Sequence, residues 1–503
     1  MAEQQTYHEM DKMKIEQVEN VAATDGATLS PSVSLRTDQP IDPILEAKIR
    51  RKLDFHIIPW IFGLWLLAFI DRSNIGNARI DGLTTQLHLT GTQFNVALAI
   101  FYVSYIIVEV PANLVLKRAR PRIFLPGIMI GWGVVGTLMG IVKSYEGLLV
   151  ARFFLGMFEG GLLGGLILYL STFYRRHELL YRVGLFYTAA PLSGAFGGLL
   201  ASGIAQMRGI GGLLGWSWIF IIEGIVTVIF GVITIFFLPN DPGSASFLTS
   251  EERHIAVERL ILDGGVTRED EAGAGFKGKQ VWRAVANWNT WLTATIFFCL
   301  ITPIYSFSLF LPTILKTFTA STTKTQLLSV PPYICGAISV LTTAHFSDRF
   351  KRRGYFIMLT TPLGITGYLL LLTSSNPTTK YVGTFLASIG IFPGSPTVMA
   401  WLSNNLAPHY TRATGTALQL AIANMAAFVA TFTYVTKDAP GYKTGHAINL
   451  GFLCVAWLVT AGTVWYNRWE NKVRDAGGRN ERWAEVRDGE DLGYRHPEFR
   501  MTI

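Results

Sequence analysis

Long apolar blocks separated by short polar connections dominate this chain of 503 residues. A helix needs about 20 apolar residues to cross the hydrocarbon core of a bilayer. Two groups of six such blocks can be marked, at 55–78, 93–116, 122–142, 148–173, 180–206 and 216–238, and at 288–312, 325–346, 355–374, 380–405, 412–435 and 447–467. The pattern predicts an all-α polytopic membrane protein with twelve transmembrane helices in two six-helix halves.

The polar segments divide the chain into five expected regions. We expect a largely disordered cytoplasmic tail at 1–54, a first half at 55–238, a cytoplasmic central loop at 239–287, a second half at 288–467 and a cytoplasmic tail at 468–503. The halves share local sequence, because Tyr169-Leu170-Ser171 recurs as Trp401-Leu402-Ser403 and the basic segment 117–122 recurs as 348–353. Parallel repeats of this kind predict a substrate site between the halves, near the middle of the membrane.

Charge is scarce, at 16% of residues, and its placement predicts the topology. The Lys and Arg residues gather in alternate short loops, such as 117–122 and 349–353, which predicts cytoplasmic termini and a cytoplasmic central loop. The net charge of +8 is therefore attributed to the basic loops that set the membrane topology. We expect the lipid bilayer as a partner, and no nucleic acid. The histidines and cysteines lack ligand spacing, and no phosphate loop or nucleophile elbow is found. We expect no metal, no cofactor and no enzymatic activity.

Four charged residues lie inside the apolar blocks, where charge is costly and typically marks a transport path. Asp71 and Arg72 are adjacent near the end of the first block, so they point about 100° apart on a helix. Arg152 and Glu159 are seven residues apart in the fourth block and share one face. A carboxylate beside a guanidinium can change its proton occupancy when a substrate anion arrives, which is the basis of proton–anion symport. The alternative is that the four residues form fixed salt bridges between the first and fourth helices.

Further polar residues lie in other blocks. Glu109 precedes Pro111 and either faces the cavity or packs between helices, whereas Glu223 is expected to reach the outer membrane interface. In the second half, an aromatic ring and amide groups could stack on and hydrogen-bond a planar heteroaromatic acid, or instead bond helices to each other; these residues are Trp401, Asn404, Asn405 and Asn424.

The loop after the eighth block carries the first family resemblance. Asp348-Arg349 followed by Lys351-Arg352-Arg353-Gly354 resembles the loop signature of the major facilitator superfamily. The resemblance implies the major facilitator fold, and it implies a gating motif made by Asp348, Arg349 and Arg352. The corresponding first-half segment has Lys117 where the acid would stand, so no gating pair is assigned there.

A narrower resemblance centres on the sequence from Phe69 to Ala78, FIDRSNIGNA. Together with Arg152-Phe153-Phe154-Leu155-Gly156 and the ending 492–500, LGYRHPEFR, it resembles the anion:cation symporter family, in particular its fungal allantoate and nicotinate permease branch. The resemblance implies that Arg72 and Arg152, with Asn74, engage a substrate carboxylate. It also implies that Glu159 is the main proton site and that Asp71 is a second proton site or a partner of Arg152.

These observations predict a secondary transporter that imports a small organic anion with protons by alternating access. We expect a monomer in the plasma membrane. Two alternatives remain open at this point: efflux of a fungal secondary metabolite on the same scaffold, and a nutrient sensor that binds without useful flux. The identity of the anion is left open between nicotinate, allantoate and other carboxylates.

Overall fold

The computed structural model describes residues 42–262, 278–319, 321–407, 409–487 and 492–503. Within these ranges every regular element is a helix, and from Glu46 onward the membrane helices form one compact unit, Glu46–Ile503. The predicted tail up to residue 41 and part of the central loop, 263–277, lie outside the described residues.

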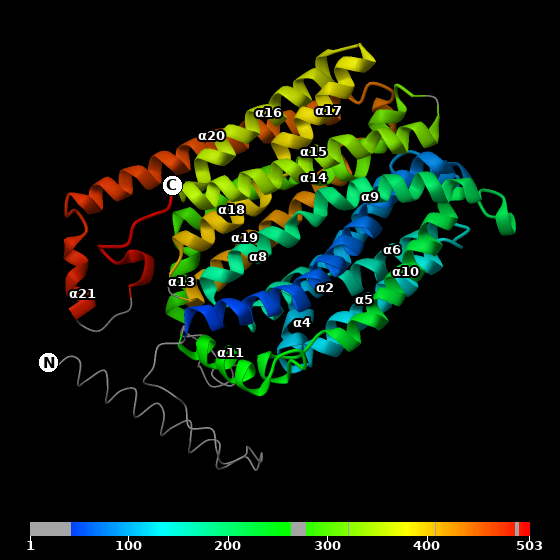
Figure 1. Ribbon diagram of the computed structural model, residues 1–503. Helices are drawn as coiled ribbons and strands as arrows, with labels where there is room; N and C mark the ends of the chain where they lie inside the picture. Colours follow the sequence, from blue (N-terminus) through cyan, green and yellow to red (C-terminus); the bar gives the residue numbers. More distant parts are fainter. Residues whose placement is uncertain (1–41, 263–277, 320, 408, 488–491) are drawn as a thin grey trace. The chain divides into compact units, whose positions relative to one another are not determined.

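The first half is made of six membrane helices, two of which are interrupted (Figure 1). They are α2 (Pro43–Ala78), α4 (Gln93–Arg118), α5 (Pro121–Met139), α6 with α7 (Tyr145–Glu159 and Leu162–Ser171), α8 with α9 (Arg176–Tyr187 and Ala189–Ile204) and α10 (Gly215–Phe237). Short turns of helix connect them, namely η1 (Arg79–Leu83), α3 (Thr84–Gln86), η2 (Ala205–Met207) and η3 (Ile210–Gly212).

The second half repeats this arrangement. Its helices are α14 (Trp288–Lys316), α15 (Thr322–Phe350), α16 (Arg353–Thr373), α17 with α18 (Pro377–Ile391 and Gly394–Asn405), α19 (His409–Thr431) and α20 (Lys443–Asp475). The connections and tail carry η4 (Pro242–Ser244), α11 (Ser250–Leu262), α13 (Gly278–Val285), η5 (Thr436–Asp438), η6 (Asn480–Arg482), α21 (Trp483–Arg487) and η7 (Gly493–Arg495).

The number and class of helices agree with the prediction from the apolar blocks. Among the described residues, eleven helices are long and apolar enough to cross a membrane, and α4 contributes the shorter apolar stretch Gln93–Glu109. Both halves use the same pairings: α4 packs on α6 and α5 on α10 in the first, and α15 packs on α17 and α16 on α20 in the second. The halves meet where α9 packs on α15 and α4 on α19.

Two helices continue beyond the apolar blocks because ion pairs accommodate their polar ends. Helix α2 begins before residue 55, and there Lys52 binds Glu252 of α11 at 2.7 Å while Asp54 binds Arg182 at 2.6 Å. Helix α20 continues past residue 467 to Asp475, where Glu470 accepts hydrogen bonds from two arginines. Charged side chains at these ends therefore extend the helices instead of ending them.

Close backbone approach brings α4 and α6 together in the middle of the first half. A side chain at Gly156 or Gly160 would collide with the backbone carbonyls of Phe101 and Tyr105 on α4. The second of these glycines directly follows Glu159 and lies at the break between α6 and α7. The glycines thus let α6 place its charged residues against α4, which positions the site described next.

Candidate functional site

A cavity of about 40 Å³ lies between the two halves. Its walls come from α2, α4, α7, α8 and α9 on one side and from α14, α18 and α19 on the other, with Phe392 at the break between α17 and α18. Aromatic rings make much of the surface, from Trp65, Phe69, Tyr105, Tyr187, Phe297, Tyr305 and Phe392, and polar groups come from Arg72, Ser395 and Asn424. This volume holds a few water molecules and is far below the roughly 300 Å³ of small-ligand sites, so a substrate requires the halves to separate.

Arg72 is the charged residue among the described side chains that line the cavity. Its guanidinium forms an ion pair with Glu159 of α6, and both side chains are almost completely buried. It also lies 5.1 Å from the ring centres of Phe69 and Tyr105, within cation–π range. Its Nε finds no hydrogen-bond partner among the described residues. The guanidinium of Arg72 is therefore held by one carboxylate and several aromatic rings, and its Nε–H is left without an acceptor among the described residues.

Arg152 lies behind this pair and is 1% exposed. Its Nε and Nη2 have no hydrogen-bond partner within the described part of the chain, and its guanidinium lies 5.8 Å from the Phe101 ring centre. An isolated buried cation is costly. The surrounding carboxylates, Asp71 and Glu159, are close enough to interact with it electrostatically. An arriving anion would be stabilised by this second positive charge.

Asp71 points away from the cavity, toward α5 and α10. Its Oδ2 accepts hydrogen bonds from Trp132 Nε1 at 3.0 Å and Thr227 Oγ1 at 3.3 Å. The structure gives no hydrogen bond between Asp71 and Arg152, so the direct partnership considered from the sequence is not formed here, although the charges are near each other. Asp71 and Arg72 thus serve different sides of α2, as their adjacency predicts.

Asn74 and Glu223 form a buried contact away from the cavity. Asn74 is fully buried and donates from Nδ2 to Glu223 Oε1, and Asn77 donates to Asn74 Oδ1 at 2.7 Å. The expectation that Glu223 reaches the membrane interface is wrong, because its side chain is 4% exposed and bonded inside the bundle. The position of Glu223 in its apolar block did not indicate that an amide donor inside the bundle, Asn74, would bind it. A role for Asn74 in substrate binding stays a prediction.

The predicted second-half residues are divided between two places. Asn424 lines the cavity and donates a hydrogen bond to Glu109 Oε2 across the two halves at 3.0 Å. Trp401 and Asn405 instead donate to the backbone carbonyl of Thr502, at 2.8 and 3.0 Å. They therefore contact the C-terminal segment 492–503. Asn404 is partly buried on the same helix, and it is not among the residues that line the cavity.

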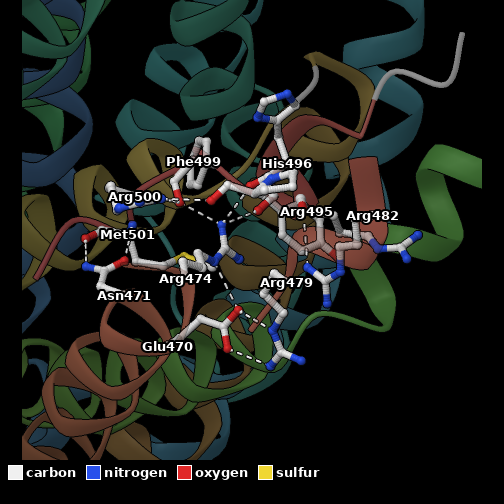
Figure 2. A network of polar contacts seen from close by, with 12 residues as sticks. Glu470, Asn471, Arg474, Arg479, Arg482, Arg495, His496, Phe499, Arg500 and Met501 are labelled. Atoms are coloured by element: carbon white, nitrogen blue, oxygen red, sulfur yellow. Dashed lines mark hydrogen bonds and ion pairs between the residues drawn. The ribbon is translucent and has the colours of Figure 1, made fainter. Parts of the chain in front are cut away.

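The C-terminal segment 492–503 is held by a network of polar contacts at the end of α20 (Figure 2). Arg474 donates from Nη1 to the carbonyls of Tyr494, His496 and Phe499 and from Nε to Glu470. Tyr494 reaches α13 through a 3.0 Å hydrogen bond from its hydroxyl to the carbonyl of Arg283. The segment thus ties together the end of α20, the end of α18 and the central-loop helix α13.

The loop motif after α15 is local. Asp348 pairs with Arg353, at the start of the next helix, and the guanidinium of Arg352 lies 5.7 Å from the Tyr355 ring centre. Arg349 and Asp348 are exposed. These contacts join α15 to α16 inside one half, and a gating role for Asp348, Arg349 and Arg352 stays a prediction.

The halves touch directly at the end of the bundle that carries residues 79–92 and 432–442, which the charge pattern predicts to be extracellular and which we call the outer end. Asn95 donates to the carbonyl of Thr431 at 2.6 Å. The Arg79 guanidinium lies 4.5 Å from the Phe94 ring centre and donates to Thr436 at 3.3 Å. Gly76 lies so close to the Leu309 carbonyl that a side chain would collide with it. The cavity is therefore closed at this end.

Sequence reasoning missed the aromatic lining. Trp65, Phe69 and Arg72 recur at spacings of four and three on α2, which places them on one face. That spacing could have been noticed beside the charge. Tyr105, Tyr187 and Tyr305 carry no comparable signal, because isolated tyrosines are ordinary in membrane helices.

Comparison with known proteins agrees with this architecture. The family model described as Major Facilitator Superfamily matches residues 61–431. An uncharacterized transporter of Schizosaccharomyces pombe is 37% identical over 92% of this chain and 90% of its own length. The high-affinity nicotinic acid transporter of Saccharomyces cerevisiae is 31% identical over 91% of this chain and 85% of its own.

A solved structure shows the same fold at low sequence identity. The inward-facing, unoccupied bacterial homolog of the human lysosomal transporter Spinster is 14% identical, with a TM-score of 0.62 over 83% of this chain and 97% of that one. Its likeness concerns the fold alone. With its twelve-helix arrangement and its similarity to fungal transporters, the chain belongs to the major facilitator superfamily, as its sequence predicted.

Proposed function

We propose that this transporter imports a small organic anion together with protons. The carboxylate of the anion replaces Glu159 as the ion-pair partner of Arg72. The observation that carries the proposal is the position of Arg72: it lines the cavity and forms a buried ion pair with Glu159. A substrate carboxylate entering the cavity would therefore meet the same guanidinium that Glu159 already occupies.

The coupling follows from charge. Breaking a buried ion pair by removing one partner costs about 3–5 kcal/mol, because the other charge is left uncompensated. Protonation of Glu159 would leave Arg72 in that condition, and a bound carboxylate would relieve it. Proton and anion thus favour each other's binding, and by linkage each raises the affinity for the other by the same factor. Arg152 supports the exchange with a second positive charge that has unused donors.

The aromatic lining supports a planar substrate. Rings from both halves, including Phe69, Tyr105 and Tyr305, surround the space next to Arg72. Offset stacking on such rings stabilises a flat conjugated acid, and Asn424 offers a hydrogen bond beside it. A relative named as a nicotinic acid transporter is consistent with this class of substrate. We propose a pyridine carboxylate or a similar ring acid as the substrate class.

The test measures uptake of radiolabelled nicotinate, allantoate and related acids at acidic and at neutral external pH, in cells expressing the chain. We expect uptake to rise at acidic pH. Glu159→Gln should still exchange labelled for unlabelled anion but lose concentrative uptake, because its neutral amide cannot release a proton. Glu146→Gln is the matched control, since Glu146 is exposed at the start of the same helix α6.

Three outcomes would contradict all or part of the proposal. Outward loss of a preloaded acid, driven by the proton gradient, would favour efflux. Binding of an acid without flux in either direction would favour a sensor. Insensitivity of concentrative uptake to Glu159→Gln would remove Glu159 from the coupling step even if import itself is found.

We further propose that the protein resides in the plasma membrane as a monomer with both termini cytoplasmic. The support is the concentration of Lys and Arg at the end that carries α11 and α13, opposite the outer end. Labelling of engineered cysteines in the connection at 205–214 and in the segment 492–503 of intact cells tests the orientation. The proposal fails if the segment 492–503 reacts with a membrane-impermeant reagent.

A further inference from the structure

Glu223 is a buried acid that the exchange at Arg72 does not use. It lies on α10, is 4% exposed, and accepts a hydrogen bond at Oε1 from Asn74 Nδ2. Its Oε2 has no hydrogen-bond partner among the described residues, and no ion pair is formed with it there. Asn77 supports Asn74 with a 2.7 Å hydrogen bond to its Oδ1. A carboxylate at this place would have one neutral donor and no cation.

A second carboxyl group, that of Asp71, lies close by and has different hydrogen-bond donors. Its Oδ2 accepts hydrogen bonds from both Trp132 and Thr227, and Thr227 stands one turn after Glu223 on the same helix. Two donors to one oxygen stabilise the charged form of a carboxyl group better than a single amide donor does. Of the two acids, Asp71 is therefore the better carboxylate and Glu223 the better neutral acid.

Counting charges leads to the same assignment. The buried cluster holds the cations Arg72 and Arg152 and the acids Asp71, Glu159 and Glu223, each at most 7% exposed. With every group ionised, two positive charges face three negative ones, and the excess negative charge would lie in a low-dielectric interior. Uncompensated buried charge is strongly disfavoured and is normally removed by a change of protonation. One bound proton makes the cluster neutral.

Of the described residues, no cation from the surrounding elements supplies this balance; Glu109 of α4, partly exposed and bonded to Asn424, interacts with Arg72 but could add only negative charge. Helix α5, which packs along α10, carries only Arg122, at its far end, and α9 carries no ionisable residue. In η1, Asp81 pairs with Arg208, and Arg79 is directed toward Phe94 and Thr436. The charged groups facing Glu223 are thus those of the cluster itself.

We propose that Glu223 is a proton-binding site, separate from Glu159, that holds a proton when the transporter carries no substrate. Asn74 orients the carboxyl group by donating to Oε1, which leaves Oε2 to carry the proton. One consequence rests on the proposed function: since the resting cluster is already neutral, binding a monovalent anion draws one further proton, to Glu159. Import of that anion would then be electroneutral and driven by the pH gradient alone.

The test uses infrared spectroscopy of the full chain in lipid nanodiscs at neutral pH, without substrate. A protonated carboxylic acid gives a carbonyl stretch separate from that of a carboxylate, and it shifts in deuterated water. We expect Glu223→Gln to remove one such band, whereas the exposed control Glu146→Gln leaves it in place. Thermal unfolding of each variant shows that it is folded.

The proposal is overturned if Glu223→Gln keeps the protonated-acid band, or if Glu223→Asp leaves its frequency unchanged, which would place the proton on another acid. Should the glutamine variant not fold, Glu223→Asp provides a second measurement, because a shorter acid at this site should move the band to a new frequency; an unmoved band contradicts the assignment. The spectrum involves no transport, so a failure of the import hypothesis leaves this result intact, and a negative spectrum leaves the uptake assay unaffected.

Discussion

Replacement of Arg474 by alanine should release the C-terminal segment 492–503 from the end of α20. The side chain is 2% exposed and its Nη1 donates to three backbone carbonyls, at 3.1, 3.2 and 2.7 Å. Each such bond contributes about 1 kcal/mol net. Glu470 keeps its two bonds from Arg479, so little is lost there. Because Nη1 carries only two hydrogens, one of these bonds is shared, and the segment should lose about 2 kcal/mol of attachment, which makes its opening about 30-fold more frequent.

Limited proteolysis with chymotrypsin measures this opening, because Tyr494 and Phe499 lie in the segment. At low protease concentration the cleavage rate follows the population of the open form. Arg500→Ala is the control: Arg500 pairs with Asp475 at 2.9 Å, but the two side chains are 44% and 63% exposed, so the change should stay within about fivefold. If Arg474→Ala is cleaved at the wild-type rate, the network in Figure 2 does not hold the segment, and the reasoning fails.

Three further predictions concern the cavity, the outer end and the central loop. Arg72→Lys should abolish concentrative uptake of nicotinate, because a lysine cannot reproduce the planar fork that binds a carboxylate; wild-type uptake would contradict this. Gly76→Leu should push the halves apart at the outer end. In a background without native cysteines, labelling of a Ser308→Cys probe from outside should then increase by about tenfold. Unchanged labelling would show that the contact between Gly76 and Leu309 does not close the cavity. Glu252 accepts hydrogen bonds from Lys52 at 2.7 Å, and these bonds lower the pKa of Glu252 below the ordinary 4.5. The ionised Glu252 therefore contributes fully to the docking of α11 above pH 4.5. This contribution is lost as the pH falls through the lowered pKa. Glu252→Gln should therefore speed amide hydrogen exchange in α11 about tenfold at neutral pH, with the difference disappearing in acid; equal exchange at neutral pH would refute the role of this pair.

The membrane helices and the buried charges could be predicted because both are local properties of the chain. A charge within an apolar block is costly wherever the helix lies, so Arg72, Arg152 and Glu159 stand out without a structure. The seven-residue spacing of Arg152 and Glu159 also places them on one face. Spacing does not choose partners, however. Glu159 pairs with Arg72 of another helix, and this depends on the approach of α2 to α6, which no local pattern contains.

Trp401 and Asn405 show where sequence reasoning ends. Their side chains are suited to binding a flat polar ligand, yet they bind the carbonyl of Thr502, about a hundred residues further along the chain. Which segment covers the end of a helix depends on the path of the whole chain. The same limit applies to Glu223, whose amide partner, Asn74, is 149 residues away. For Trp401 and Asn405 residue type predicted a polar partner without identifying it, whereas for Glu223 it predicted the membrane interface, which is wrong.

The division of charge between the halves bears on how the transporter can open. The ion pair Arg72–Glu159 lies within the first half, and the described residues with which the second half lines the cavity are uncharged. Separation of the halves therefore leaves that pair intact and exposes Arg72 to an incoming anion. At the cavity, the hydrogen bond from Asn424 to Glu109 joins the two halves, and opening must break it. Because a charged acceptor makes a stronger hydrogen bond than a neutral one, protonation of Glu109 would weaken this contact between the halves.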